Sequence, residues 1–250
     1  MIVNATDVKN NFGFYLEMLA REDVIVLKNG KPVARMSRQS GWEQGLRLGE
    51  EVAEYNLDCT LHSDEDELAG KHLTFSQFMK FYEKTDKRYE YIDGKAWLMG
   101  APTEQHQRII GNLHVLLYLF LKGKPCRVYL SPLDIFLGSR STDHNVVQPD
   151  IVVICQPENF DDKGRYQGAP TIAIEVLSPT SRSHDLVCKM GLYLRSGVQE
   201  YWTIDGASQQ IILNIFDQGQ IREQQVFKSG DEIRSACLDG LVVPVNSVFD

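Results

Sequence analysis

The sequence predicts a mixed α/β protein of the α+β kind, with a small β-α-β-β unit before a larger mixed sheet flanked by helices. Apolar residues recur at helical spacing over residues 103–121, and short apolar runs of strand length follow from residue 126 onward. Asn-Gly and Asp-Gly pairs at 29–30 and 93–94 are typical of tight hairpin turns. At 250 residues, 43% of them hydrophobic and 24% charged, the chain has the composition and length of a globular protein with a substantial core.

The first unit, residues 1–38, has the order strand, helix and hairpin. Thr6 is placed to cap a helix, and strands at 24–27 and 32–36 flank the Asn-Gly turn. A core of this size is too small to be stable alone, so we expect a homodimer.

Residues 2–36 resemble the N-terminal DNA-binding half of the Phd/YefM antitoxins, through the segments 5–12 and 24–34. The resemblance implies a dimer that binds operator DNA. It places Lys9 where the family usually has an arginine facing DNA, with Asn11 beside it. A pure dimerisation module is the alternative interpretation.

The acidity of the chain is concentrated in one segment. The net charge of −8 argues against a generic nucleic-acid coat protein, which would be basic. Residues 39–72 hold nine acidic residues against two Lys or Arg. We expect this segment to be an acidic linker, partly helical, and its second interpretation is a tail that binds a protein partner.

Neither a membrane protein nor a disulfide-rich secreted protein is expected. No apolar stretch reaches 18 residues, and the first residues lack the basic segment of a secretory signal. The five cysteines are scattered, odd in number and without C-x-x-C spacing, so neither structural zinc nor a disulfide framework is expected. These observations favour a reducing cytoplasm.

The third part, residues 73–250, alternates helices and strands. Thr74 is placed to cap a short helix, and residues 89–99 form a hairpin ahead of the long helix at 103–121. Further strands are expected at 126–130, 133–137, 151–154, 171–177, 200–205, 211–216 and 221–227, with a helix at 183–195 that ends before Gly197.

Two acidic residues stand in apolar runs. Asp150 follows Gln148-Pro149 at the start of one run, and Glu175 lies inside another. Acids are almost never buried unless they are paired or bound to a metal. On adjacent strands the two carboxylates could share a divalent cation, Mg²⁺ or Mn²⁺, which polarises a phosphate oxygen and lowers the pKa of an attacking water. This is the chemistry of phosphodiester cleavage.

Such a site also needs a cationic side chain to orient the water. In the commonest nuclease arrangement a lysine lies two residues after the second acid, where this chain has Leu177. Lys189, on the next predicted helix, could reach back into the site, and Asp185 lies four residues earlier on the same helix face.

Residues 73–245 resemble the PD-(D/E)XK nuclease superfamily, in its branch of restriction endonucleases first catalogued as a domain of unknown function. The segments that carry the resemblance are 89–94, His106, 148–150, 174–179, Asp185 with Lys189, and 197–202. It implies a restriction-endonuclease-like fold that cleaves DNA. Asp150 and Glu175 would bind the metal, Lys189 would be a relocated catalytic lysine, and Glu90 and His106 would lie at the same cleft.

Each of these residues has a structural alternative. Asp150 could end a strand, Lys189 could be solvated, His106 could cap its helix, and Glu90 could pair with a basic side chain of its own hairpin. At the level of function, the alternatives are a catalytically inactive DNA-binding regulator that keeps the nuclease fold, and an antitoxin whose segment 39–72 holds a toxin.

Overall fold

The computed structural model describes residues 2–4, 24–28, 31–36, 68–138, 144–178 and 188–250. The chain divides into two compact units, Met1–Asn56 and Leu57–Asp250.

The first unit contains a three-stranded sheet in the order β1-β2-β3, with β1 at Ile2–Asn4, β2 at Val24–Lys28 and β3 at Lys31–Met36. β1 pairs parallel with β2, and β2 pairs antiparallel with β3. All three expected strands are therefore present. A parallel pair needs a crossover connection rather than a tight turn.

Several predictions fall outside the described residues. They are the helix that Thr6 would cap, the DNA-binding assignments of Lys9 and Asn11, the partly helical character of residues 39–67, and the pairing of Asp185 with Lys189. These stay predictions.

The first helices and the first hairpin of the second unit lie where the sequence predicts them. α3 (Phe75–Tyr82) begins with a capping box, in which Thr74 and Gln77 satisfy each other's backbone N–H groups. β4 (Tyr89–Ile92) and β5 (Lys95–Leu98) form the expected hairpin. α4 (Glu104–Leu121) begins after Thr103, whose side chain accepts from the His106 N–H.

The strands of the second unit, β4 and β5 included, form two sheets and a separate pair. The five-stranded sheet has the order β10-β7-β8-β4-β5, the six-stranded sheet has the order β14-β13-β12-β11-β9-β6, and the pair is β15 with β16. Their bounds are β6 Arg127–Leu130, β7 Ile135–Leu137, β8 Asn145–Val147, β9 Ile151–Ile154, β10 Tyr166–Gln167, β11 Ile172–Leu177, β12 Glu200–Asp205, β13 Gln210–Asp217, β14 Gln220–Phe227, β15 Glu232–Arg234 and β16 Val242–Pro244. The other helices are a 3-10 turn at Pro157–Asn159, α5 at Met190–Ser196 and α6 at Asn246–Phe249.

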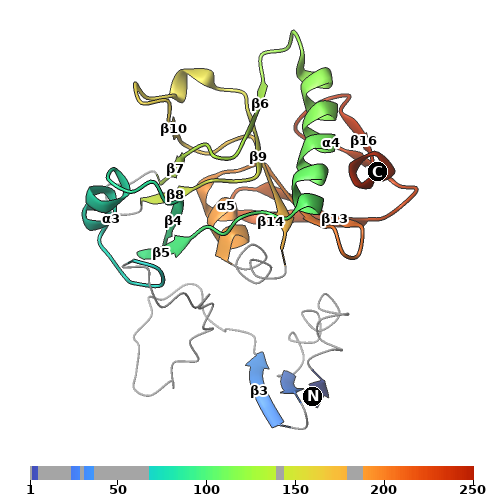
Figure 1. The fold of residues 1–250 in the computed structure, drawn as a ribbon. Helices are drawn as coiled ribbons and strands as arrows, with labels where there is room; N and C mark the ends of the chain where they lie inside the picture. Colours follow the sequence, from blue (N-terminus) through green and yellow to red (C-terminus); the bar gives the residue numbers. More distant parts are fainter. Residues whose placement is uncertain (1, 5–23, 29–30, 37–67, 139–143, 179–187) are drawn as a thin grey trace. The chain divides into compact units, whose positions relative to one another are not determined.

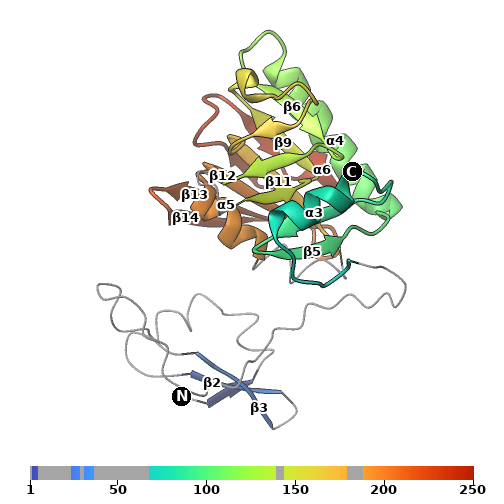
Figure 2. The same cartoon turned by 90° about the vertical axis from the view of Figure 1, so that its left-hand side faces the viewer.

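Helices cover both faces of the six-stranded sheet (Figures 1 and 2). Successive side chains of a strand point to opposite faces. Ile172 and Ile174 of β11 accordingly pack in one cluster with α4, whereas Ala173 packs in another with Tyr193 of α5. The alternation places Glu175 on the α5 face of the sheet. The mixed α/β fold with mixed sheets and few helices confirms the predicted fold class.

A disulfide joins Cys126 and Cys155, although the scattered cysteines predicted no disulfide framework. β6 and β9 are antiparallel, and the pairing of Arg127 with Ile154 brings the two preceding and following cysteines opposite each other. Spacing along the chain does not reveal this pair, because strand register creates it across 29 residues of separation.

No helix in the described ranges is both long and apolar enough to cross a membrane.

Candidate active site

The two acids found in the sequence lie side by side on adjacent antiparallel strands. Ile151 of β9 pairs with Ile174 of β11, and Asp150 and Glu175 each stand one position beyond that pair. Asp150 Oδ2 accepts a hydrogen bond from the Val176 N–H at 2.8 Å. Asp150 therefore contacts β11 directly beside Glu175, and the joint binding of a metal by the two acids stays a prediction.

Glu175 is buried, with a residue exposure of 3%. Its Oε1 atom accepts from Lys189 Nζ at 2.9 Å and from the Tyr193 hydroxyl at 2.8 Å. A buried carboxylate needs partners of this kind, because its desolvation is costly unless it is paired and hydrogen-bonded. Both partners come from the segment that contains α5.

Lys189 lies between two carboxylates. Its side chain is 2% exposed, and Nζ lies 2.9 Å from both Glu175 Oε1 and Glu90 Oε1. The backbone at residues 188–189 makes a wide π-type turn just before α5 begins at Met190, a local geometry that is frequent at functional sites. The solvated alternative for Lys189 does not hold, because its side chain is buried between the two carboxylates. Its role as the relocated catalytic lysine stays a prediction.

Glu90 is fully buried on β4, and its Oε1 atom also accepts from the Gln148 N–H at 2.9 Å. Pairing within its own hairpin is not what the structure shows. Arg88 donates to Gln148 instead, and Lys95 lies over the Trp97 ring. Glu90 therefore ties the five-stranded sheet to the site on the six-stranded one.

His106 lies in the first turn of α4, and its Nε2 atom is 3.2 Å from Asp150 Oδ2. The side chains are 12% and 15% exposed, so this end of the cluster is the part that solvent reaches. The five residues predicted as catalytic form two contact groups, Glu90–Lys189–Glu175 and His106–Asp150. The hydrogen bond from the Val176 N–H to Asp150 links the two groups, which together make the carboxylate cluster. Their catalytic roles stay predictions.

Tyr193 was missed in the sequence. It lies four residues after Lys189, a spacing that puts both side chains on one helix face and that could have identified it. Burial, followed by the charges of Glu175 and Glu90, raises the pKa of its phenol well above the ordinary value. The hydroxyl therefore stays protonated and donates to Glu175.

Gln148 is a second residue whose role the sequence did not reveal. Its Nε2 atom donates to the Tyr82 hydroxyl at 2.9 Å and to Asp134 Oδ1 at 2.8 Å, and its Oε1 atom accepts from Arg88 Nε at 2.8 Å. Burial and the hydrogen bond to Asp134 raise the pKa of Tyr82. The network fixes the strand that leads into Asp150.

The carboxylates of the site can be compared with the ligands that a divalent cation takes. Lys189 contacts Glu175 and Glu90, whereas Asp150 contacts His106. Within the described ranges no three His, Cys, Asp or Glu side chains converge on one point. Mg²⁺ usually takes only one or two carboxylates from a protein and completes its shell with water and phosphate oxygens. Asp150 and Glu175 match that donor set.

Comparison with protein families gives a match over most of the larger unit. The model of the Uma2 family, described as "Putative restriction endonuclease", matches residues 75–246. The match includes all five residues of the cluster.

Two proteins of Synechocystis sp. are similar in sequence. The uncharacterized protein slr1290 is 28% identical over 142 residues, which cover 56% of this chain and 73% of that protein. The uncharacterized protein sll1609 is 26% identical over 137 residues, covering 54% and 76%.

A solved structure shares the fold. The crystal structure of a putative nuclease belonging to DUF820, from Anabaena variabilis, superposes with a TM-score of 0.59 at 24% identity, covering 71% of this chain and 97% of that one.

Proposed function

Since the chain belongs to the Uma2 family of nucleases, we propose that it is a Mg²⁺- or Mn²⁺-dependent endonuclease that hydrolyses phosphodiester bonds of DNA. The observation that carries the proposal is the position of Lys189. Its ammonium group lies 2.9 Å from both Glu175 and Glu90. Asp150 accepts a hydrogen bond from the N–H of Val176, the residue after Glu175. Two acids and a lysine on adjoining elements form the set that metal-assisted phosphodiester cleavage requires.

Asp150 and Glu175 are the proposed metal ligands. A bound Mg²⁺ would polarise the phosphate and lower the pKa of the attacking water. Lys189 orients that water and stabilises the negative charge that develops on the phosphoryl oxygens. Glu90 holds Lys189 in place from the opposite side. Attack of water at phosphorus breaks one P–O bond, and the products are a phosphate monoester and an alcohol.

His106 is the proposed acid-base residue. Its Nε2 atom contacts Asp150 at the solvent-reached end of the cluster, where a leaving oxygen could take a proton. The same contact fixes the orientation of the Asp150 carboxylate, so His106 acts on the metal ligand as well.

The first unit is proposed to bind DNA as a homodimer, with Lys9 and Asn11 facing the DNA. One support is the resemblance of residues 2–36 to the Phd/YefM antitoxins. A second is the β1-β2-β3 sheet, whose order agrees with a first strand that pairs beside the β2–β3 hairpin. The acidic segment 39–72 would be the place for a protein partner.

The proposed location is the cytoplasm, where an enzyme of this class would meet DNA. A reducing cytoplasm favours the thiol form of the Cys126–Cys155 pair.

Plasmid cleavage tests the nuclease proposal. We expect the purified full-length protein to nick supercoiled DNA with Mg²⁺ or Mn²⁺, and chelation to stop the reaction. Glu175→Gln should lower the rate by at least about 100-fold, because it removes a ligand charge at the reacting centre. Glu158→Gln is the matched control, since Glu158 is exposed in the 3-10 turn at Pro157–Asn159, outside the cluster.

Equal cleavage by the wild-type protein and Glu175→Gln would overturn the proposal. Absence of cleavage with both metals would favour the inactive DNA-binding regulator, an alternative motivated by Leu177 at the usual lysine position. The antitoxin alternative predicts that a small protein partner co-purifies through residues 39–72.

A further inference from the structure

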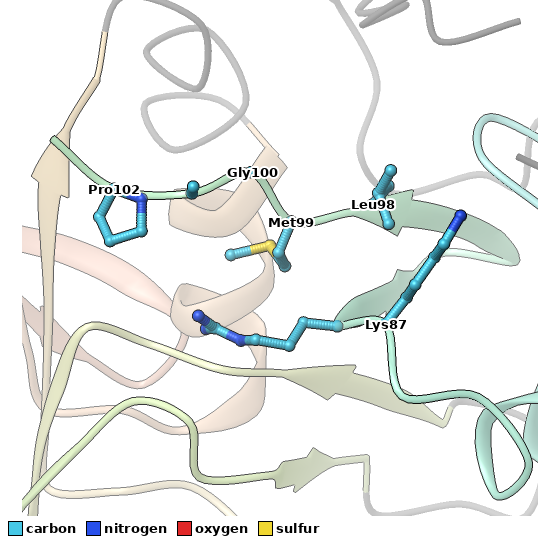
Figure 3. Close-up of a pocket in the computed structure, with 7 residues that line it drawn as sticks. Lys87, Leu98, Met99, Gly100 and Pro102 are labelled. Carbon is cyan, nitrogen blue, oxygen red and sulfur yellow. The ribbon is translucent and has the colours of Figure 1, made fainter. Parts of the chain in front are cut away.

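A shallow pocket lies next to the carboxylate cluster and has a different chemistry. Its volume is about 370 Å³, and it is lined by Lys87, Arg88 and residues 98–102, which connect β5 to α4. In Figure 3 Met99 points into the pocket, Pro102 lies at one end, and Lys87 and Leu98 lie at the other. The walls are thus apolar, and the charged lining groups are both cationic.

Arg88 is held in place without being neutralised. Its Nε atom donates to Gln148 Oε1 at 2.8 Å, and its Nη2 atom donates to Ser131 Oγ at 2.5 Å. Both acceptors are uncharged, and within the described ranges no carboxylate forms an ion pair with Arg88. An arginine that is ordered by neutral groups keeps its charge for an anion, and its planar fork suits a phosphate.

The pocket borders the candidate active site from two directions. On one side Arg88 binds Gln148, whose N–H binds Glu90, which binds Lys189. On the other side Pro102 precedes Thr103 and the first turn of α4, where His106 contacts Asp150. The pocket is therefore connected to the site both through Arg88 and Gln148 and through the start of α4.

We propose that this pocket binds the nucleotide next to the scissile phosphodiester of a DNA strand. Arg88 binds the phosphate of that nucleotide, and the apolar wall around Met99 contacts its sugar or base. Phosphate contacts of this kind set the register of a nucleic acid on a protein. The inference rests on the proposed function, since it assigns a substrate position relative to the cleaved bond.

Binding of a short oligonucleotide tests the pocket. A DNA trinucleotide, added to the full-length protein in EDTA and followed by ligand-detected NMR, reports binding without cleavage. We expect Arg88→Gln to weaken binding about tenfold, as for loss of one charge-assisted hydrogen bond. The slope of log affinity against log salt should fall by about 0.7, the value for one phosphate contact on a single strand.

Arg222→Gln is the control, because it makes the same change of charge on the exposed face of β14 and should leave binding unchanged. Met99→Glu is a second test that leaves the Gln148 network intact. It places a negative charge in the pocket and should weaken binding at least as much as Arg88→Gln.

Three results would overturn the proposal: no binding by the wild-type protein, equal binding by all variants, or equally strong, Arg88-dependent binding of inorganic phosphate, which would make the pocket a plain anion site. Cleavage need not occur for this test. If the wild-type protein does not cleave DNA but Arg88→Gln loses trinucleotide binding, the pocket proposal stands and the nuclease proposal fails. If the wild-type protein cleaves DNA but Arg88→Gln binds the trinucleotide as well as the wild-type protein does, the nuclease proposal stands and the pocket proposal fails.

Discussion

At the scale of single residues, Lys189 is important both for stability and for the proposed activity. It is the shared cation of two buried carboxylates, Glu175 and Glu90. Removing one member of a buried ion pair typically costs about 3–5 kcal/mol, because the remaining charge is left without compensation. A loss of activity in a Lys189 variant therefore needs a folding measurement beside it, and Glu175→Gln, which keeps the shape of the side chain, is the cleaner probe.

Tyr193 should stabilise the protein through its hydroxyl group. Tyr193→Phe removes the hydrogen bond to Glu175 Oε1, and a hydrogen bond to a charged group contributes about 1.5–3 kcal/mol. We expect the free energy of unfolding in urea to fall by that amount. Cleavage should also slow, since Glu175 would lose one of the groups that orient it.

Tyr129→Phe is the matched control for this change. The Tyr129 ring packs against Phe160, and the structure gives its hydroxyl no hydrogen bond among the described residues. The control should leave the unfolding free energy nearly unchanged. Equal stability of Tyr193→Phe and Tyr129→Phe would show that the Glu175 contact contributes nothing.

How far a residue's role could be predicted depended on how unusual the residue is in its setting. Asp150 and Glu175 stand out because acids are rare in apolar runs. Arg88 and Gln148 are ordinary in sequence, and their roles come from contacts across 60 residues of separation. The role of Tyr193 was partly predictable. Its spacing of four residues from Lys189 places both side chains on one helix face, but a tyrosine on an apolar helix face is usually only a core residue.

At the scale of elements, the β6–β9 ladder is closed by the Cys126–Cys155 disulfide. Under denaturing conditions without reductant we expect three reactive thiols among the five cysteines. In the native protein Cys237 should react slowly, because burial raises the pKa of its thiol to about 12. Thiol titration and mass spectrometry of non-reduced peptides measure both.

The same bond should contribute to stability in the oxidised protein. A cross-link that closes 29 residues corresponds to about 3–4 kcal/mol of lost chain entropy in the unfolded state. The double variant Cys126→Ala/Cys155→Ala should be destabilised by that amount, and reductant should remove the difference from wild type. Five thiols in the unreduced, denatured protein would contradict both expectations.

At the scale of the whole molecule, stability should fall in alkaline solution. Burial is the first cause that raises the pKa values of Tyr82, Tyr91, Tyr166 and Tyr193 in the folded protein. The unfolded chain releases these protons near the ordinary pKa of 10.0, whereas the folded chain retains them. The unfolded state therefore binds fewer protons above about pH 10, and the free energy of unfolding decreases as the pH rises further.

Urea unfolding between about pH 8 and about pH 11 measures this effect, with tyrosinate absorbance followed in parallel. The absorbance of the buried tyrosines should rise only as the protein unfolds, and Tyr193→Phe should show a shallower loss of stability. Free ionisation of all tyrosines in the folded protein at about pH 10 would contradict the prediction.

The amino-acid sequence by itself determined the order of helices and strands, the capped starts of α3 and α4, and the two acids that mark the site. These features depend on local spacing, which is written along the chain. The tertiary structure decided that Lys189 lies between Glu175 and Glu90, that Cys126 faces Cys155, and that Arg88 presents its charge to a pocket beside the acids. Those pairings depend on strand register and sheet order. The local sequence around a residue does not determine which distant residue the fold places opposite it.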